Sequence, residues 1–114
     1  MNTPSSVVAK MPKQVRVGCY IFTVEMGETW AHDGEFGHVS LETQSIRLRK
    51  GGSSRKLANT FLHEVLHSIH WVYGLGDASN EEQFTELSAN GLCSFWLDNP
   101  QAMQWIKELL GVKA

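Results

Sequence analysis

The residues most clearly suited to metal binding or catalysis are two histidines and a glutamate in the pattern HExxH. His63 and His67 are four positions apart, and Glu64 directly follows the first histidine. On a helix, side chains at i and i+4 project from the same face, so both imidazoles can bind one metal ion. Neutral imidazole suits Zn²⁺, and Glu64 would lie beside the open coordination position. The pattern predicts a zinc site with Glu64 as general base for a metal-activated water.

A catalytic zinc keeps three protein ligands, so a further ligand is expected after this helix. Glu86 follows His67 by 19 positions (86 − 67), which leaves room for a turn and an antiparallel return helix. Glu82 is the alternative ligand, although it can already act in helix capping. Asn90, one turn after Glu86, is placed to hydrogen-bond a ligand histidine and fix its tautomer. We therefore predict His63, His67 and Glu86 as metal ligands.

The other histidines and tyrosines have less defined roles. His70 is about 10 Å along a helix axis from His63, too far to share one ion with it, so we expect His70 to pack or to support a ligand. His70 and Tyr73 occupy the glycine and third-histidine positions of HExxHxxGxxH, which excludes the metzincin pattern. The donor that would stabilise an oxyanion stays open among Tyr73, His38, His32 and Tyr20.

The elements that must position these residues follow from hydrophobic periodicity. Val15–Val24 is rich in β-branched and aromatic residues, which predicts a buried strand. Gly27–Gly37 carries three glycines and predicts a connection. Gln44–Arg49 alternates, with Ile46 and Leu48 on one face and Arg47 and Arg49 on the other, and predicts a half-exposed edge strand.

Caps and apolar spacing predict three helices, of which the first carries HExxH. Their predicted limits are about Lys56 to Gly74, with an N-cap at Ser53 or Ser54; Ser79 to Asn99, with a capping box from Ser79 and Glu82; and Pro100 to Leu110, ending at Gly111.

Length and composition fit one small domain. The chain has 114 residues, of which 42% are hydrophobic and 19% charged. We expect a lead-in over residues 1–14 and one α+β domain over residues 15–114, with a small sheet packed on the HExxH helix. The formal charge of −2 argues against a nucleic-acid partner. Two cysteines and the absence of an apolar N-terminal run predict a cytoplasmic protein with no membrane span.

The stretches LHEVLHSI and FTELSANGL cover the two central predicted helices and resemble the gluzincin branch of zinc metallopeptidases. Within that branch they are similar to minimal ImmA/IrrE-type domains and to small phage or prophage metallopeptidases. In that family the second helix supplies a glutamate ligand in an E-x-x-A-N setting, which falls here on Glu86, Ala89 and Asn90. The helix stop at Asp98, Asn99 and Pro100 also resembles the small phage proteins. The resemblance implies a zincin-like fold, a zinc-dependent peptidase and a phage or prophage origin.

In zincins the strand before the active-site helix usually pairs with an extended peptide, a role that would fall on Ile46, Arg47 and Leu48. The expected partner is a protein or peptide substrate, such as a host or phage regulator. Two other functions fit the same residues: a zinc-stabilised, catalytically idle binding module that recruits a partner through this edge strand, and a metal-free fold whose histidines only pack. Glu64 favours hydrolysis, because a structural zinc site needs no general base.

Overall fold

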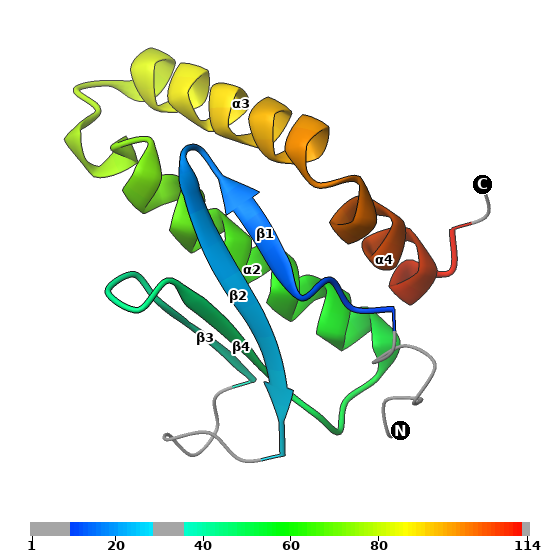
Figure 1. Ribbon diagram of the computed structural model, residues 1–114. Helices are drawn as coiled ribbons and strands as arrows, with labels where there is room; N and C mark the ends of the chain where they lie inside the picture. The colour runs from blue at the N-terminus through cyan, green and yellow to red at the C-terminus, as the bar shows by residue number, and fades with distance from the viewer. Residues whose placement is uncertain (1–9, 29–35, 113–114) are drawn as a thin grey trace.

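The computed structural model describes residues 10–28 and 36–112 as a small α+β domain (Figure 1). In chain order the elements are β1 (Gln14–Val17), β2 (Tyr20–Gly27), β3 (Gly37–Ser40), β4 (Ser45–Arg49), α2 (Ser54–Val72), the 3₁₀ turn η1 (Leu75–Asp77), α3 (Glu81–Asp98) and α4 (Pro100–Leu110). No helix in these two ranges is long and apolar enough to cross a membrane.

The strands form one mixed sheet in the order β1-β2-β4-β3. β1 pairs antiparallel with β2, β2 pairs parallel with β4, and β3 pairs antiparallel with β4. The single strand predicted for Val15–Val24 is wrong, because this segment contains a hairpin. Gly18 has a φ of 61° at the two-residue turn, a backbone conformation that favours glycine, and Val17 pairs with Tyr20 across it.

The predicted edge position of Ser45–Arg49 is also wrong. β4 lies between β2 and β3, so its backbone pairs on both sides. Ile46 and Leu48 are fully buried, and an extended substrate cannot pair with Ile46, Arg47 or Leu48. β3 occupies one edge of the sheet instead, in a segment whose start was predicted to belong to a connection.

The helices agree closely with the caps that the sequence carries. Ser53 caps α2 by accepting a hydrogen bond from the Lys56 N–H, and Gly74 follows the helix with a φ of 67°. α4 has the predicted limits, with proline first and Gly111 after its end at a φ of 74°. α3 begins one residue later than a Ser79 cap would place it, because Asn80 is the cap and accepts from the Gln83 N–H.

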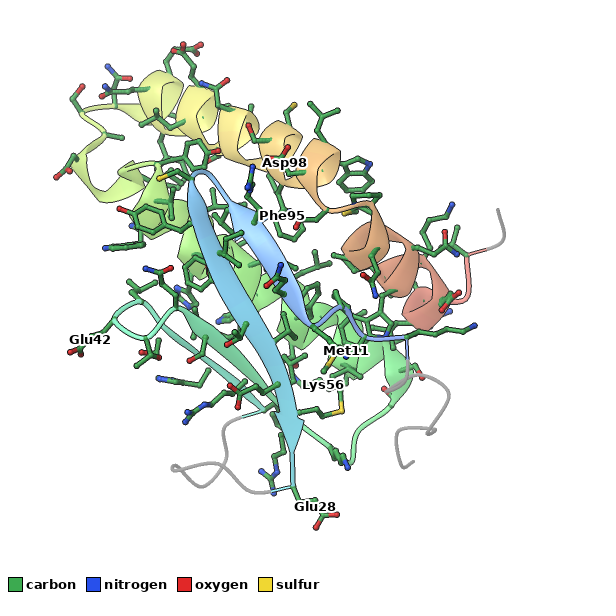
Figure 2. The ribbon with its side chains drawn as sticks, viewed as in Figure 1. Met11, Glu28, Glu42, Lys56, Phe95 and Asp98 are labelled. Carbon is green, nitrogen blue, oxygen red and sulfur yellow. The ribbon has the colours of Figure 1, made fainter. Side chains whose placement is uncertain are left out.

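The core lies between the sheet and α2, with α3 and α4 completing it from the β1 side (Figure 1). Phe22, Ile46 and Leu48 from the sheet meet Phe61, Val65 and Ile69 from α2, all at most 1% exposed. Trp105 of α4 packs edge-on against Phe61, with ring centroids 5.2 Å apart. α3 returns along the molecule in the direction opposite to α2, and its Phe95 lies over β1 (Figures 1 and 2).

The sheet and the C-terminal helices are joined by one buried amide. The Asn99 side chain accepts a hydrogen bond from the Arg16 N–H and donates one to the Arg16 carbonyl, both at 2.7 Å. It also donates to the Phe95 carbonyl at 3.0 Å. Residues that precede the predicted domain start at residue 15 already pack on the domain, since Pro12 is buried and β1 starts at Gln14. Residues 1–9 of the predicted lead-in lie outside the described ranges.

Candidate metal centre

The HExxH motif lies in the middle of α2, where its two histidines point out of the core. His63 and His67 are both on the outer side of the helix, and their Nε2 atoms are 3.1 Å apart. Two imidazole nitrogens bound tetrahedrally to one zinc at about 2.0–2.1 Å would be about 3.3 Å apart. The two nitrogens are thus already close to the separation that shared metal binding needs.

Glu64 completes this group from the buried side. Glu64 is buried, with 6% of its surface exposed. One ligand atom from each of His63, Glu64 and His67 lies within 4.8 Å of the other two. Imidazole and carboxylate donors at this separation suit Zn²⁺ and other divalent metals. These three residues could therefore hold a metal ion.

β3 covers Glu64 because Gly37 allows a very close approach to α2. A Cβ built on Gly37 would lie 2.6 Å from the Thr60 Cγ2 and 3.1 Å from the Glu64 Oε2. Both distances are shorter than ordinary van der Waals contact, so a side chain at position 37 would push the strand away. Sequence reasoning missed this role, because glycines at the end of a polar stretch are typical of a turn.

Two hollows meet at this group. The larger, about 580 Å³, extends along α2 toward its C-terminal end and is lined by Val39, Leu41, His70 and Trp71. The smaller, about 180 Å³, extends toward the start of α2 and is lined by Phe36, Lys56, Asn59 and Thr60. Gly37, His63 and Glu64 line both hollows, so the candidate metal centre lies at their junction.

The residues predicted on α3 lie outside the group. Glu86, Glu82 and Asn90 are all exposed, and none of them is among the clustered ligand atoms. Gly91 faces α2, where its Cβ position is 2.5 Å from the Ile69 Cγ2, and Glu86 lies about 140° around the helix from Gly91. Glu86 is therefore outside the clustered ligand atoms, and its role as third ligand stays a prediction.

Aromatic candidates for an oxyanion donor are divided between the site and other parts of the molecule. His70 lines the larger hollow and lies beside Phe84 of α3, whereas Tyr20 stacks at an angle on Trp71 with centroids 5.0 Å apart. Tyr73 packs against the buried core. His32 lies outside the described residues.

His38 borders the larger hollow but does not face α2. Because Gly37 faces α2 and strand side chains alternate, the imidazole of His38 lies on the opposite face of the sheet, beside its cross-strand partner Arg47. His38 is nevertheless one of the residues that line the hollow, together with its neighbours Gly37 and Val39.

Fold and site together define a small α+β domain with a candidate metal centre on its central helix. Comparisons with protein-family models, with curated proteins and with solved structures give no match for this chain. The resemblance to gluzincins therefore stays a prediction from the two sequence stretches that carry it.

Proposed function

We propose that this chain is a zinc-dependent metallopeptidase of the gluzincin type, with a zincin-like fold, that hydrolyses peptide bonds of a protein substrate in the cytoplasm. The observation that carries this proposal is the group of His63, Glu64 and His67, with ligand atoms within 4.8 Å, beneath the edge strand β3. The two free cysteines, Cys19 and Cys93, fit a reducing compartment.

Each residue of the group has a separate task. His63 and His67 would hold the zinc through their Nε2 atoms, which already converge. When bound, zinc supplies a Lewis acid that polarises a carbonyl and lowers the pKa of water. The Glu64 carboxylate would take a proton from the attacking water and deliver it to the nitrogen of the departing amine. Its burial beneath Gly37 limits the orientations that this carboxylate can adopt.

The edge of β3 supplies the place for an extended peptide, in the role first predicted for β4. Within the described ranges, β3 pairs with β4 on one side and with no strand on the other. Gly37, His38 and Val39 of β3 line the hollow into which His63 and His67 also face. A peptide that pairs with this edge would pass directly over the group, with its backbone held by main-chain hydrogen bonds.

The direct test combines metal content with hydrolysis. Purified without added metal, the wild type should contain one zinc per chain and cleave peptides. His63→Ala should lose both properties, whereas Glu64→Gln should keep zinc and lose turnover by at least about a hundredfold, because it removes the proton acceptor. His70→Ala, an exposed histidine on the same helix outside the group, is the matched control and should keep its zinc. A Glu64→Gln variant with undiminished turnover would refute the proposal.

The third ligand is tested in the same assay. Glu86→Ala should lower zinc affinity, and Glu82→Ala, one turn earlier on the exposed face of α3, should leave it unchanged. Equal affinities in wild type and Glu86→Ala would remove Glu86 from the ligand set.

A second function is favoured by one feature of the site. The described group contains two histidines and a glutamate but no ligand from α3, which fits a zinc-stabilised, catalytically idle module that recruits a protein partner. Under this alternative, chelation would lower the melting temperature, and neither wild type nor Glu64→Gln would cleave any peptide.

A further inference from the structure

The smaller hollow beside the metal group is lined by a positively charged side chain, that of Lys56. Lys56 lies at the start of α2 (Figure 2), and its Nζ is 4.6 Å from the centroid of the Phe36 ring. The guanidinium carbon of Arg49 is 5.8 Å from the same centroid. The aromatic ring thus contacts two cations. Of these, Lys56 lines the smaller hollow, on the opposite side of the group from Trp71, and Arg49 does not line it.

Lys56 has a cation–π contact but no acidic partner in the described part of the chain. No carboxylate of residues 10–28 or 36–112 lies within 4.0 Å of its ammonium. Four other polar side chains line the hollow: His63 and Glu64 belong to the metal group, and Asn59 and Thr60 are neutral. The Thr60 hydroxyl already donates to the Lys56 carbonyl. An ammonium group there is available to a carboxylate from another molecule.

The spacing fixes how far along a bound peptide this carboxylate would lie. Lys56 precedes His63 by seven residues, which corresponds to about 10 Å along the helix axis. An extended peptide advances about 3.3 Å per residue, so about 10 Å corresponds to about three residues. A carboxylate at Lys56 would therefore belong to a residue two or three positions from the bond above the metal group.

The direction of β3 decides on which side of that bond the residue lies. β3 runs from Gly37, at the Lys56 end, to Ser40, near the end that Leu41 and Trp71 line. An antiparallel peptide, the more stable pairing per residue, would run the opposite way and place its C-terminal part at Lys56.

We propose that Lys56, held against the Phe36 ring, forms a subsite for a peptide carboxylate two or three residues C-terminal to the cleaved bond. This inference rests on the proposed peptidase function and names its substrate class. The carboxylate comes either from an aspartate or glutamate side chain or from the C-terminus of the substrate. The first source defines an endopeptidase with acidic preference, and the second an enzyme that releases short C-terminal peptides.

The cleavage test uses the zinc-loaded full chain and a randomised peptide library whose products are sequenced. Wild type should favour acidic residues at the second or third position after the cleaved bond by about three- to fivefold, the range expected for one partly exposed ion pair. Lys56→Gln should abolish this preference, and Lys56→Glu should reverse it toward lysine and arginine. Lys13→Glu has the same charge change beside β1 at the opposite edge of the sheet, and should behave as wild type.

Binding gives a readout that does not depend on turnover. Acetylated, C-terminally amidated alanine-rich hexapeptides with glutamate or glutamine at the fifth position, and a glutamine peptide with a free C-terminus, are titrated into zinc-loaded Glu64→Gln by NMR. The side-chain source predicts tighter binding of the glutamate peptide, and the terminal source predicts tighter binding of the free-terminus peptide. Either gain should be absent in Glu64→Gln/Lys56→Gln and should shrink as salt rises.

The outcomes separate the two proposals. Cleavage with no acidic or terminal preference, or an equal preference in Lys56→Gln, would overturn the subsite and leave the peptidase function standing. Absence of cleavage from every peptide would overturn the peptidase function, and the subsite with it. Lys56→Glu places a negative charge in the first turn of a helix, where it is favourable, so loss of folding should not obscure the result.

Discussion

Substitution of Gly37 by alanine tests whether the close approach of β3 to α2 builds the site. The new Cβ would lie 2.6 Å from the Thr60 Cγ2, whereas relaxed carbon atoms are about 3.5–4.0 Å apart, so the strand must move by about 1 Å. Forcing an extra methyl into a packed site costs about 1–3 kcal/mol. We expect Gly37→Ala to lower the free energy of unfolding by about 2 kcal/mol.

Urea unfolding followed by circular dichroism measures this change. With a denaturant slope of about 1.5 kcal/mol/M, a loss of about 2 kcal/mol lowers the midpoint by about 1.3 M. Gly52→Ala is the matched control, because its Cβ would meet only Lys56 carbons at an ordinary 3.6 Å. Its midpoint should change little or rise slightly, since alanine restricts the unfolded chain.

A second substitution identifies the cause of the loss. Thr60→Ser removes the methyl that a Cβ at position 37 would strike and keeps the hydroxyl that donates to the Lys56 carbonyl at 2.8 Å. Alone it should cost about 1 kcal/mol for the buried methyl. The double variant should be more stable than the sum of the single losses predicts, by at least about 1 kcal/mol. Additivity within about 0.5 kcal/mol, or a Gly37→Ala midpoint equal to wild type, would refute the steric argument.

Two further stability predictions concern the packing of α3. Gly91→Ala should lower the free energy of unfolding by about 1–2 kcal/mol, although alanine has the better helix propensity, because the new Cβ would lie 2.5 Å from the Cγ2 of the stiff Ile69 side chain. A higher melting temperature for this variant would contradict the prediction. Asn99→Ala should lower the free energy of unfolding by about 2 kcal/mol, since it leaves the Arg16 N–H and carbonyl without their amide partner. Asn90→Ala, on the exposed face of α3, is the control and should lower it by less than about 0.5 kcal/mol in the same urea titration.

The elements predicted correctly are those whose ends carry local chemistry. α4 has the expected limits because proline and glycine at its two ends act without help from the rest of the fold. α2 begins after Ser53 for the same reason. For α3, Ser79 and Asn80 are both competent caps, and pattern alone could not decide between them. The Ser79 N–H and hydroxyl instead donate to the Gln83 side chain, so both residues contribute to the start of the helix.

The sheet was harder to predict, because strand pairing depends on residues distant in sequence. Alternation of Ile46 and Leu48 with Arg47 shows that one face of β4 is buried, and this is equally true of an edge strand and an internal strand. In the structure β4 pairs with β2 on one side and β3 on the other. The alternation pattern does not reveal how many strands pair with β4. The hairpin at Gly18 had a local signal, a glycine between two apolar runs, that composition alone obscured.

The site shows the same division. The HExxH spacing predicted the convergence of His63 and His67, because helix geometry fixes it within one element. The position of Glu86 depends on how α3 rotates against α2, which Gly91 and the residues around it determine through packing. A ligand on a second helix therefore needs tertiary information that a motif does not contain.

The close contact at Gly37 links the fold to both proposals. β3 has only four residues and pairs with one strand in the described ranges, so its distance from α2 depends on the small volume at position 37. A displacement of about 1 Å would open the cover of Glu64 and raise the proposed peptide-binding edge away from the histidines. Gly37→Ala should thus weaken peptide binding as well as stability, and Thr60→Ser should restore part of both. If the double variant regained stability without peptide binding, β3 would act only as a structural strand, and the peptide would have to bind elsewhere.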